Sequence, residues 1–222
     1  MRERQSRREE LDLDHAFWHD RWQSQQIGFH EDDGSSFLKQ WFHVLNLSEG
    51  DRVFVPLCGK SRDIAWLLSQ GMGVVGCELS EIAVKELFEE LDVEPTVRAV
   101  GEFIHYAGPD VDVFVGDVFA LSASVLGAVS AVYDRAALIA LPEPMRARYA
   151  EHLKQLAPKA PHLIVSIEYD QRLMSGPPFS VDGTAIGRLY GEAYELTQLD
   201  WVETPHNLKG VCPAGERVWL MG

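Results

Sequence analysis

The chain has 222 residues, and 46% of them are hydrophobic, which is enough to fill the core of a single α/β domain. Its 20 lysines and arginines against 34 aspartates and glutamates give a net charge of −14. This charge repels phosphate backbones and anionic lipid, so it argues against nucleic-acid and membrane partners and favours a small-molecule partner. We predict a charged, flexible extension over residues 1–13 and one domain over residues 14–222.

The cysteines and the lack of long apolar runs indicate the cellular compartment of the protein. Cys58, Cys77 and Cys212 have no metal-ligand spacing, and an odd number of free thiols is typical of a reducing compartment. No stretch of the sequence approaches the roughly 18 apolar residues that a membrane-spanning helix needs. We therefore expect a cytoplasmic monomer that binds no metal.

Trp18 and Trp22 stand four residues apart in the first predicted helix, so they share one helical face. Two interpretations remain open. The face packs into the core, or it forms a lid across the mouth of a binding site together with the loop at residues 26–30. As a lid, the two tryptophans and Phe29 would offer aromatic faces to a bound cation.

A second helix is predicted over residues 37–45, whose apolar positions recur at helical spacing and indicate core packing. The apolar run at residues 53–57 then predicts a buried strand. It leads through a tight turn with Gly59 into a helix over residues 63–70, which Ser61 can cap. A strand, a tight turn and a helix start bring backbone N–H groups together, so this segment predicts a site for a small ligand.

The residues of this turn match neither of two phosphate-binding motifs, the P-loop and the dinucleotide fingerprint. A P-loop needs glycine at the position of Phe54, and the dinucleotide fingerprint needs more glycines than the single Gly59. A second buried strand, residues 74–79, carries Glu78 at its end, where an acid reaches ribose hydroxyls. An adenosyl ligand without phosphates fits both observations, and S-adenosylmethionine is such a ligand.

A third buried strand is also followed by a polar residue at its carboxyl end. Residues 103–106 predict a short extra strand, and the strand at residues 111–115 is followed by Asp117, Val118 and Phe119. Asp117 could accept the adenine amino group, with Val118 and Phe119 against the ring. Alternatively, Asp117 caps the next helix.

Arg135 follows the fourth predicted strand, residues 129–133. A guanidinium at this edge can hold the cofactor carboxylate or an anionic substrate. A third possibility is a structural ion pair with Asp134 or with another acid. The pattern leaves all three roles open.

The remaining predicted elements complete an α/β sheet. They are a helix over residues 142–156, a strand over 163–167, a helix over 185–193 and a closing antiparallel pair over 195–202 and 217–221. The loop after the fifth strand contains Pro178 and Phe179. The aromatic side chain at the tip of this loop would cover a substrate pocket. Alternatively, the loop only connects the strand to the next helix.

Four motifs occur in a fixed order along the chain. They are Phe17-Trp18-x-x-Arg21-Trp22 with Ile27-Gly28-Phe29-His30, Val53-Phe54-Val55-Pro56-Leu57-Cys58-Gly59-Lys60-Ser61-x-Asp63, Val75-Gly76-x-Glu78-Leu79-Ser80 and Tyr133-Asp134-Arg135-Ala136-Ala137-Leu138. With these motifs the chain resembles the bacterial thiopurine S-methyltransferase family from Phe17 to its end. Gly176-Pro177-Pro178-Phe179 adds to the resemblance.

The resemblance implies a single-domain, Rossmann-like fold of the class I S-adenosylmethionine-dependent methyltransferases, with a mostly parallel seven-stranded sheet and an N-terminal helical lid. It places the cofactor against Trp22, Leu57, Glu78 and Arg135, with Trp18 on the same lid. It places Phe29 against the substrate.

The resemblance also implies S-methyl transfer to thiopurine-like aromatic or heterocyclic thiols, and in bacteria to selenium or tellurium species. Because such thiols are largely anionic near neutral pH, we expect catalysis by positioning, without a general base. The alternative is a non-catalytic S-adenosylmethionine-binding sensor, which would bind the cofactor without turnover.

Overall fold

The computed structural model describes residues 15–27, 33–204 and 206–222. The predicted extension over residues 1–13 and the predicted substrate residue Phe29 lie outside the described residues. A helix over residues 15–23 comes first. The elements that follow it are α2 (Ser36–Trp41), η1 (Phe42–Leu45), β1 (Arg52–Pro56), α3 (Arg62–Ser69), β2 (Gly73–Glu78), α4 (Glu81–Glu90), β3 (Thr96–Val100), β4 (Phe103–Gly108), β5 (Val111–Val115), η2 (Val118–Ala120), α5 (Ala123–Leu126), β6 (Ala131–Arg135), η3 (Leu138–Ala140), α6 (Glu143–Leu156), β7 (His162–Tyr169), α7 (Gly183–Tyr190), β8 (Leu196–Glu203) and β9 (Ala214–Met221).

One sheet organises the described residues, with nine strands in the order β3-β4-β5-β2-β1-β6-β7-β9-β8. Strands β5, β2, β1, β6 and β7 pair in parallel. Strand β9 runs antiparallel to β7 and β8, and the β3-β4 hairpin is antiparallel to β5. The predicted Rossmann-like fold is confirmed, with its seven strands running from β5 to β8.

The β3-β4 hairpin adds two strands to the seven that the sequence predicts. The short strand predicted at residues 103–106 is β4, but β3 is not predicted. Strand β3 lies at the sheet edge, and its residues are exposed except for a half-buried Val100. A strand with no buried face shows no apolar alternation, so the sequence pattern contains no signal for it.

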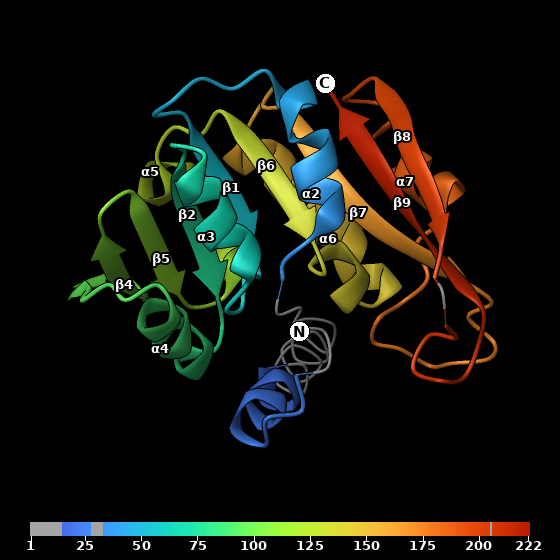
Figure 1. The fold of residues 1–222 in the computed structure, drawn as a ribbon, viewed down its shortest axis with the longest axis horizontal. Helices are drawn as coiled ribbons and strands as arrows, with labels where there is room; N and C mark the ends of the chain where they lie inside the picture. The colour runs from blue at the N-terminus through green and yellow to red at the C-terminus, as the bar shows by residue number, and fades with distance from the viewer. Residues whose placement is uncertain (1–14, 28–32, 205) are drawn as a thin grey trace, which may run out of the picture.

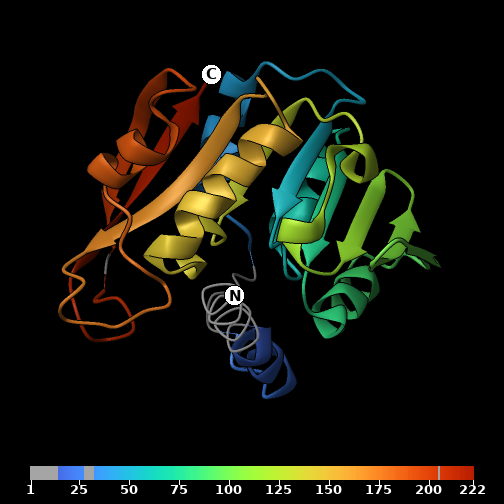
Figure 2. The same cartoon turned by 180° about the vertical axis from the view of Figure 1, so that it is seen from behind.

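Helices cover both faces of this sheet, with α2, α3 and α4 on one face in Figure 1 and α5, α6 and α7 on the other in Figure 2. Side chains of strand β1 pack against the helices on both faces of the sheet. Its Phe54 packs in the α5–α7 layer, whereas Val53 and Val55 pack in the α2–α4 layer. A parallel strand buried on both faces is apolar at every position, which explains why this run has no polar alternation.

A serine side chain caps the N-terminus of each helix that follows one of the first two strands. The Oγ of Ser61 accepts the N–H of Asp63 at 3.2 Å at the start of α3. The Oγ of Ser80 accepts the N–H of Ala83 at 3.4 Å at the start of α4. These caps satisfy N–H groups that the first helical turn leaves without partners. They hold both helix N-termini at the carboxyl ends of β1 and β2.

Most predicted boundaries differ from the structure by one to three residues, and two of the differences concern β6 and α2. Strand β6 extends to Arg135, so Arg135 ends the strand instead of following it. The helix predicted over residues 37–45 is α2 followed by the 3-10 turn η1, and its Leu38 and Leu45 are buried as predicted. Among the described helices, none combines the length and apolar character needed to cross a membrane.

Candidate active site

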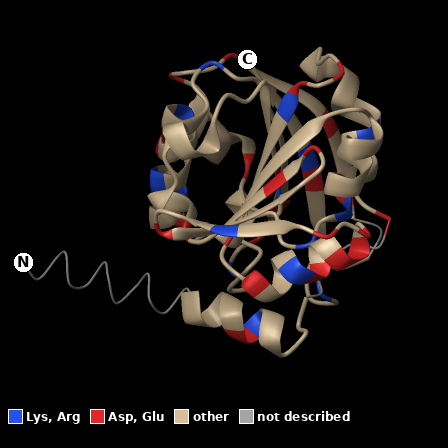
Figure 3. Ribbon diagram, turned by 90° about the vertical axis from the view of Figure 1, so that its left-hand side faces the viewer, with Lys and Arg blue, Asp and Glu red and all other residues tan. Residues whose placement is uncertain are grey.

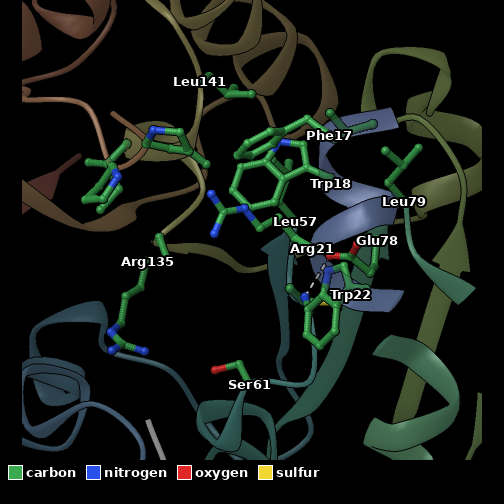
Figure 4. Close-up of a pocket in the computed structure, with 18 of the residues that line it drawn as sticks. Phe17, Trp18, Arg21, Trp22, Leu57, Ser61, Glu78, Leu79, Arg135 and Leu141 are labelled. Atoms are coloured by element: carbon green, nitrogen blue, oxygen red, sulfur yellow. Dashed lines mark hydrogen bonds between the residues drawn. The ribbon is translucent and has the colours of Figure 1, made fainter. Parts of the chain in front are cut away.

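A cavity of about 640 Å³ lies at the carboxyl ends of β1, β2, β5 and β6. The helix over residues 15–23 lies beyond these strand ends (Figures 1 and 3) and forms part of the cavity wall. Figure 4 shows Phe17, Trp22 and Glu78 on one side of the cavity and Arg135 on the opposite side. The structure thus brings residues from separate motifs together at the edge where the sequence predicts a ligand.

The turn after β1 has left-handed backbone at Leu57, with φ of 46°, and at Gly59, with φ of 52°. Glycine adopts this conformation readily, whereas a leucine in it is uncommon and marks a constrained turn. The N–H of Cys58 donates to the carbonyl of Cys77 at 3.3 Å and fastens the turn to β2. A Cβ on Gly76 would lie 2.7 Å from the Cys58 Sγ, so only glycine at that position leaves room for this turn.

Glu78 is buried at the carboxyl end of β2, with 7% of its surface exposed. Its Oε2 accepts the N–H of Gly59 at 2.8 Å, and its Oε1 accepts the N–H of Ser80 at 2.8 Å. Burial raises the pKa of Glu78 above its ordinary value, and the backbone N–H bonds oppose that rise. The carboxylate is therefore fixed at the cavity, and each oxygen keeps a lone pair for a ligand hydroxyl.

The N-terminal helix packs Trp22 onto the same turn. Trp22 is 2% exposed, and its Cζ2 lies 3.0 Å from where a Cβ on Gly59 would stand. The Nε2 of Gln25 donates to the Oε1 of Glu86 on α4 at 2.9 Å, which ties the end of the helix to the domain. Trp22 is buried and also lines the cavity, so it fits both interpretations of the aromatic face. Trp18 is half-buried and lines the cavity as well.

Asp117, Val118 and Phe119 all line the cavity after β5. The Oδ1 of Asp117 accepts the N–H of Phe119 at 2.9 Å and caps η2, so the capping role considered for this aspartate is present. Its Oδ2 lies 3.8 Å from the Nε2 of His15 on the N-terminal helix. The predicted contact of Asp117 with adenine stays a prediction.

Arg135 forms an ion pair with Asp63, whose Oδ2 lies 3.5 Å from its Nη1. Asp63 is 1% exposed, and it also accepts the hydroxyl of Tyr133 at 3.0 Å and the N–H of Ser35 at 2.6 Å. Asp134 makes its hydrogen bonds elsewhere, to residues that follow β6 and to α6. The structural partner of Arg135 is therefore an acid other than its neighbour. Arg135 still lines the cavity, so a structural pair and a ligand role are compatible.

The loop after β7 places Pro178 at the cavity, whereas Phe179 does not line it. The hydroxyl of Tyr169 donates to the carbonyl of Pro178 at 2.6 Å. The N–H of Phe179 donates to the carbonyl of Ile139 at 2.6 Å. A Cβ on Gly176 would lie 2.6 Å from the Phe179 ring, so this ring packs against its own loop. A contact of Phe179 with the substrate stays a prediction.

A sequence model of thiopurine S-methyltransferase (TPMT) matches residues 13–221. The thiopurine S-methyltransferase of Xanthobacter autotrophicus is 54% identical over 92% of this chain and 97% of its own length. The one of Teredinibacter turnerae is 49% identical over 93% of this chain and 96% of its own length. The chain belongs to the thiopurine S-methyltransferase family.

A solved structure supports the fold of this family member. The 1,6-didemethyltoxoflavin-N1-methyltransferase of Burkholderia thailandensis, solved with S-adenosylhomocysteine, matches with a TM-score of 0.62 over 96% of this chain and 89% of that chain. Its sequence is 17% identical, so the likeness concerns the fold alone.

Family membership makes the chain an S-adenosylmethionine-dependent S-methyltransferase, as the sequence predicts. The comparisons give no support to the alternative of a non-catalytic sensor. The cavity fits this cofactor, because Glu78 offers carboxylate oxygens for ribose hydroxyls and Trp18 and Trp22 offer aromatic faces for a sulfonium. The turn after β1 contains no glycine-rich phosphate cradle, which an adenosyl ligand does not need.

Sequence reasoning misses further residues that line the cavity of this family member, among them Arg21, Leu141, Met145 and Lys209. Leu141 and Met145 are apolar and buried, so their pattern indicates only core. Lys209 lies between β8 and β9 in a segment without periodicity. Among these four, Arg21 gives a signal, because it stands one residue before Trp22 in the first motif.

Proposed function

We propose that the chain methylates the sulfur of small, thiopurine-like aromatic or heterocyclic thiols. The observation that carries this proposal is the composition of the cavity lining. The lining contains Glu78 and the turn after β1, and it also contains the apolar side chains of Leu141, Met145 and Pro178. The carboxylate and the turn suit an adenosyl group, and the apolar side chains suit a flat ring, which they remove from water.

The proposed cofactor contacts come from strand ends and from the N-terminal helix. They are Trp18, Trp22, Leu57, Glu78, Asp117, Val118, Phe119 and Arg135. When bound, S-adenosylmethionine would supply a methyl group on a sulfonium sulfur. In-line displacement by a thiolate would form the thioether bond, break the bond between the sulfonium sulfur and the methyl carbon, and release S-adenosylhomocysteine. Glu78 orients the ribose by accepting its hydroxyls, and the tryptophans of the N-terminal helix exclude water from the reacting atoms.

The proposed catalysis is alignment of the thiol with the methyl group. Thiopurine-like thiols are largely anionic near neutral pH, so no residue of the chain has to remove a proton. Alignment in a closed site can supply about 7–11 kcal/mol of the barrier reduction. We extend the proposal to selenium and tellurium nucleophiles, whose soft atoms suit the same apolar part of the cavity.

We further propose that the chain acts as a cytoplasmic monomer on small molecules and not on nucleic acids. The net charge of −14 supports this, because it repels phosphate backbones. The three cysteines are all free and buried, which suits a reducing compartment. Sedimentation at micromolar concentration checks the oligomeric state.

Transfer of a labelled methyl group tests the proposed function. The protein is incubated with methyl-labelled S-adenosylmethionine and a panel of aryl and heterocyclic thiols, with an aliphatic thiol as the comparison. We expect the label in the thioethers of the aryl and heterocyclic thiols. Cofactor binding without transfer to any thiol would contradict the proposal.

Replacing Arg135 by lysine tests whether this residue binds the cofactor carboxylate. Lysine keeps the charge but loses the planar pair of N–H donors. We expect the affinity for S-adenosylhomocysteine to fall about tenfold, which corresponds to about 1.4 kcal/mol. Calorimetric titration measures the affinity, and Arg172→Lys, at an exposed arginine paired with Asp170, is the matched control.

The variant separates the three roles considered for Arg135. A loss confined to the Michaelis constant for anionic thiols would assign Arg135 to the substrate. Normal binding and turnover with a lowered melting temperature would leave only its structural pair with Asp63.

A further inference from the structure

Glu86 of α4 does not line the cavity, but its carboxylate contacts two segments that do. Its Oε1 accepts a hydrogen bond at 2.9 Å from the Nε2 of Gln25, just after the end of the N-terminal helix. Its Oε2 lies 3.0 Å from the Nζ of Lys60, in the turn after β1. One half-buried carboxylate therefore joins the N-terminal helix to the turn at the ligand edge of the sheet.

The two joined segments both contain groups that are proposed to face the adenosyl ligand. Trp22 stands three residues before Gln25, and its Cζ2 lies 3.0 Å from where a Cβ on Gly59 would stand. The N–H of Gly59, next to Lys60 in the turn, donates to the Oε2 of Glu78 at 2.8 Å. A shift of the helix relative to the turn would thus separate the aromatic wall from the ribose acceptor.

Gln25 has a left-handed backbone conformation, with φ of 54°. Its N–H donates to the carbonyl of Trp22 at 3.2 Å, and the N–H of Gln26 donates to the carbonyl of Arg21 at 2.9 Å. These two bonds form a Schellman motif, in which glycine is the usual residue at the left-handed position. Glutamine is strained there, and such strain persists only where the surrounding structure holds it. Glycine would fit this backbone better but would have no side chain to reach Glu86.

The lysine partner of Glu86 has a second carboxylate beside it. The Nζ of Lys60 lies 2.9 Å from the Oε1 of Glu90, one turn further along α4. The Oε2 of Glu90 lies 3.3 Å from the Nε of Arg62, at the start of α3. Because Lys60 keeps Glu90 when Glu86 is removed, loss of Glu86 would weaken the attachment of the N-terminal helix more than that of the turn.

We propose that Glu86 is a positioning residue for cofactor binding, which fastens the N-terminal helix through Gln25 and thereby slows the release of S-adenosylmethionine and S-adenosylhomocysteine. Glu86 acts through Trp22, which the fastened helix holds on Gly59. The proposal rests on the part of the proposed function that places Trp22 against the cofactor. It involves neither the thiol nor the transfer of the methyl group.

Replacing Gln25 by glycine tests the contact without breaking the helix end. Glycine removes the side chain that reaches Glu86 but suits the left-handed backbone, so the melting temperature without ligand should stay close to that of the wild type. Labelled S-adenosylhomocysteine, chased with unlabelled ligand, should dissociate about fivefold faster, because a hydrogen bond to a charged group is lost. Asn46→Gly, at an exposed amide residue with φ of 50° outside the cavity, is the matched control and should keep the wild-type rate.

A double-variant cycle assigns the effect to Glu86. Glu86→Ala should speed dissociation by about the same factor, and Gln25→Gly in that background should add nothing, because the contact is already lost. Glu86→Gln keeps an oxygen that can accept from Gln25, so it should restore part of the slow release. Glu89→Ala, which removes an exposed acid from the same helix, is the control for charge.

Three outcomes have definite meanings. Effects of Gln25→Gly and Glu86→Ala that multiply in the double variant would show that the two residues act separately and would overturn the proposal. A wild-type dissociation rate in both single variants would overturn it as well, and a lowered melting temperature in Glu86→Ala would then leave that residue a structural role. Absence of methyl transfer to every thiol, with faster release retained in both variants, would contradict the proposed function and support the role of Glu86.

Discussion

Replacing Glu78 by alanine is expected to lower the affinity for S-adenosylhomocysteine tenfold to a hundredfold, as measured by calorimetry. A hydrogen bond to a charged group contributes about 1.5–3 kcal/mol, and the ribose would lose its carboxylate acceptor. The same change removes the acceptor of the Gly59 and Ser80 N–H groups. Each buried donor left unpaired costs about 1–3 kcal/mol, so the melting temperature should fall too.

Glu78→Gln separates the loss of cofactor contact from the loss of stability. Glutamine keeps the shape and one oxygen acceptor but has no charge. We expect its melting temperature to lie between those of the wild type and Glu78→Ala, with cofactor affinity still reduced. Glu89→Ala, which removes an exposed acid from α4, is the control for net charge. Unchanged affinity in a folded Glu78→Ala protein would refute the ribose assignment.

Replacing Asp63 by alanine is expected to lower the free energy of unfolding by about 3–5 kcal/mol, the usual effect of removing one partner from a buried ion pair. The loss is large because Asp63 accepts from Arg135, from the Tyr133 hydroxyl and from the Ser35 N–H at once. Domains of this kind are typically stable by about 5–15 kcal/mol, so the variant should unfold at much lower urea concentration.

A double variant shows how much of this effect comes from the ion pair. Asp63→Ala with Arg135→Met removes both charges, so no arginine is left buried without its partner. We expect the double variant to be more stable than the sum of the two single losses predicts. Strict additivity of the urea-derived free energies would show that Arg135 and Asp63 do not interact, contrary to the structure.

The strand-turn-helix units around the cavity are predictable because each depends on neighbouring residues. The apolar run before Gly59 gives a strand buried on both faces, and Ser61 supplies the helix cap at the expected position. Ser80 caps α4 in the same way. Glu78 reaches the cavity because β2 pairs in parallel with β1 and ends at the same edge. A sheet built from such units brings these strand ends together whatever the loops between them contain.

The direction of two side chains near the site is decided by contacts that the sequence pattern does not specify. Asp117 caps its own turn, an interaction within three residues, and this local alternative is the one that the structure shows. The Phe179 ring faces its own loop because backbone contacts with Ile139 and the close approach of Gly176 orient it. A sequence pattern places both residues near the site but does not determine the direction of either side chain.

The sequence by itself determined an α/β sheet, its ligand edge and the acid at the end of β2, because apolar periodicity and turn chemistry act over a few residues. The methyltransferase fold followed from the resemblance of the four motifs to a known family. Only the tertiary structure decided that Arg135 at the end of β6 pairs with Asp63 of α3. These charges come from elements far apart in the chain. Their energies depend on distance and burial in the folded state, and a one-dimensional pattern specifies neither.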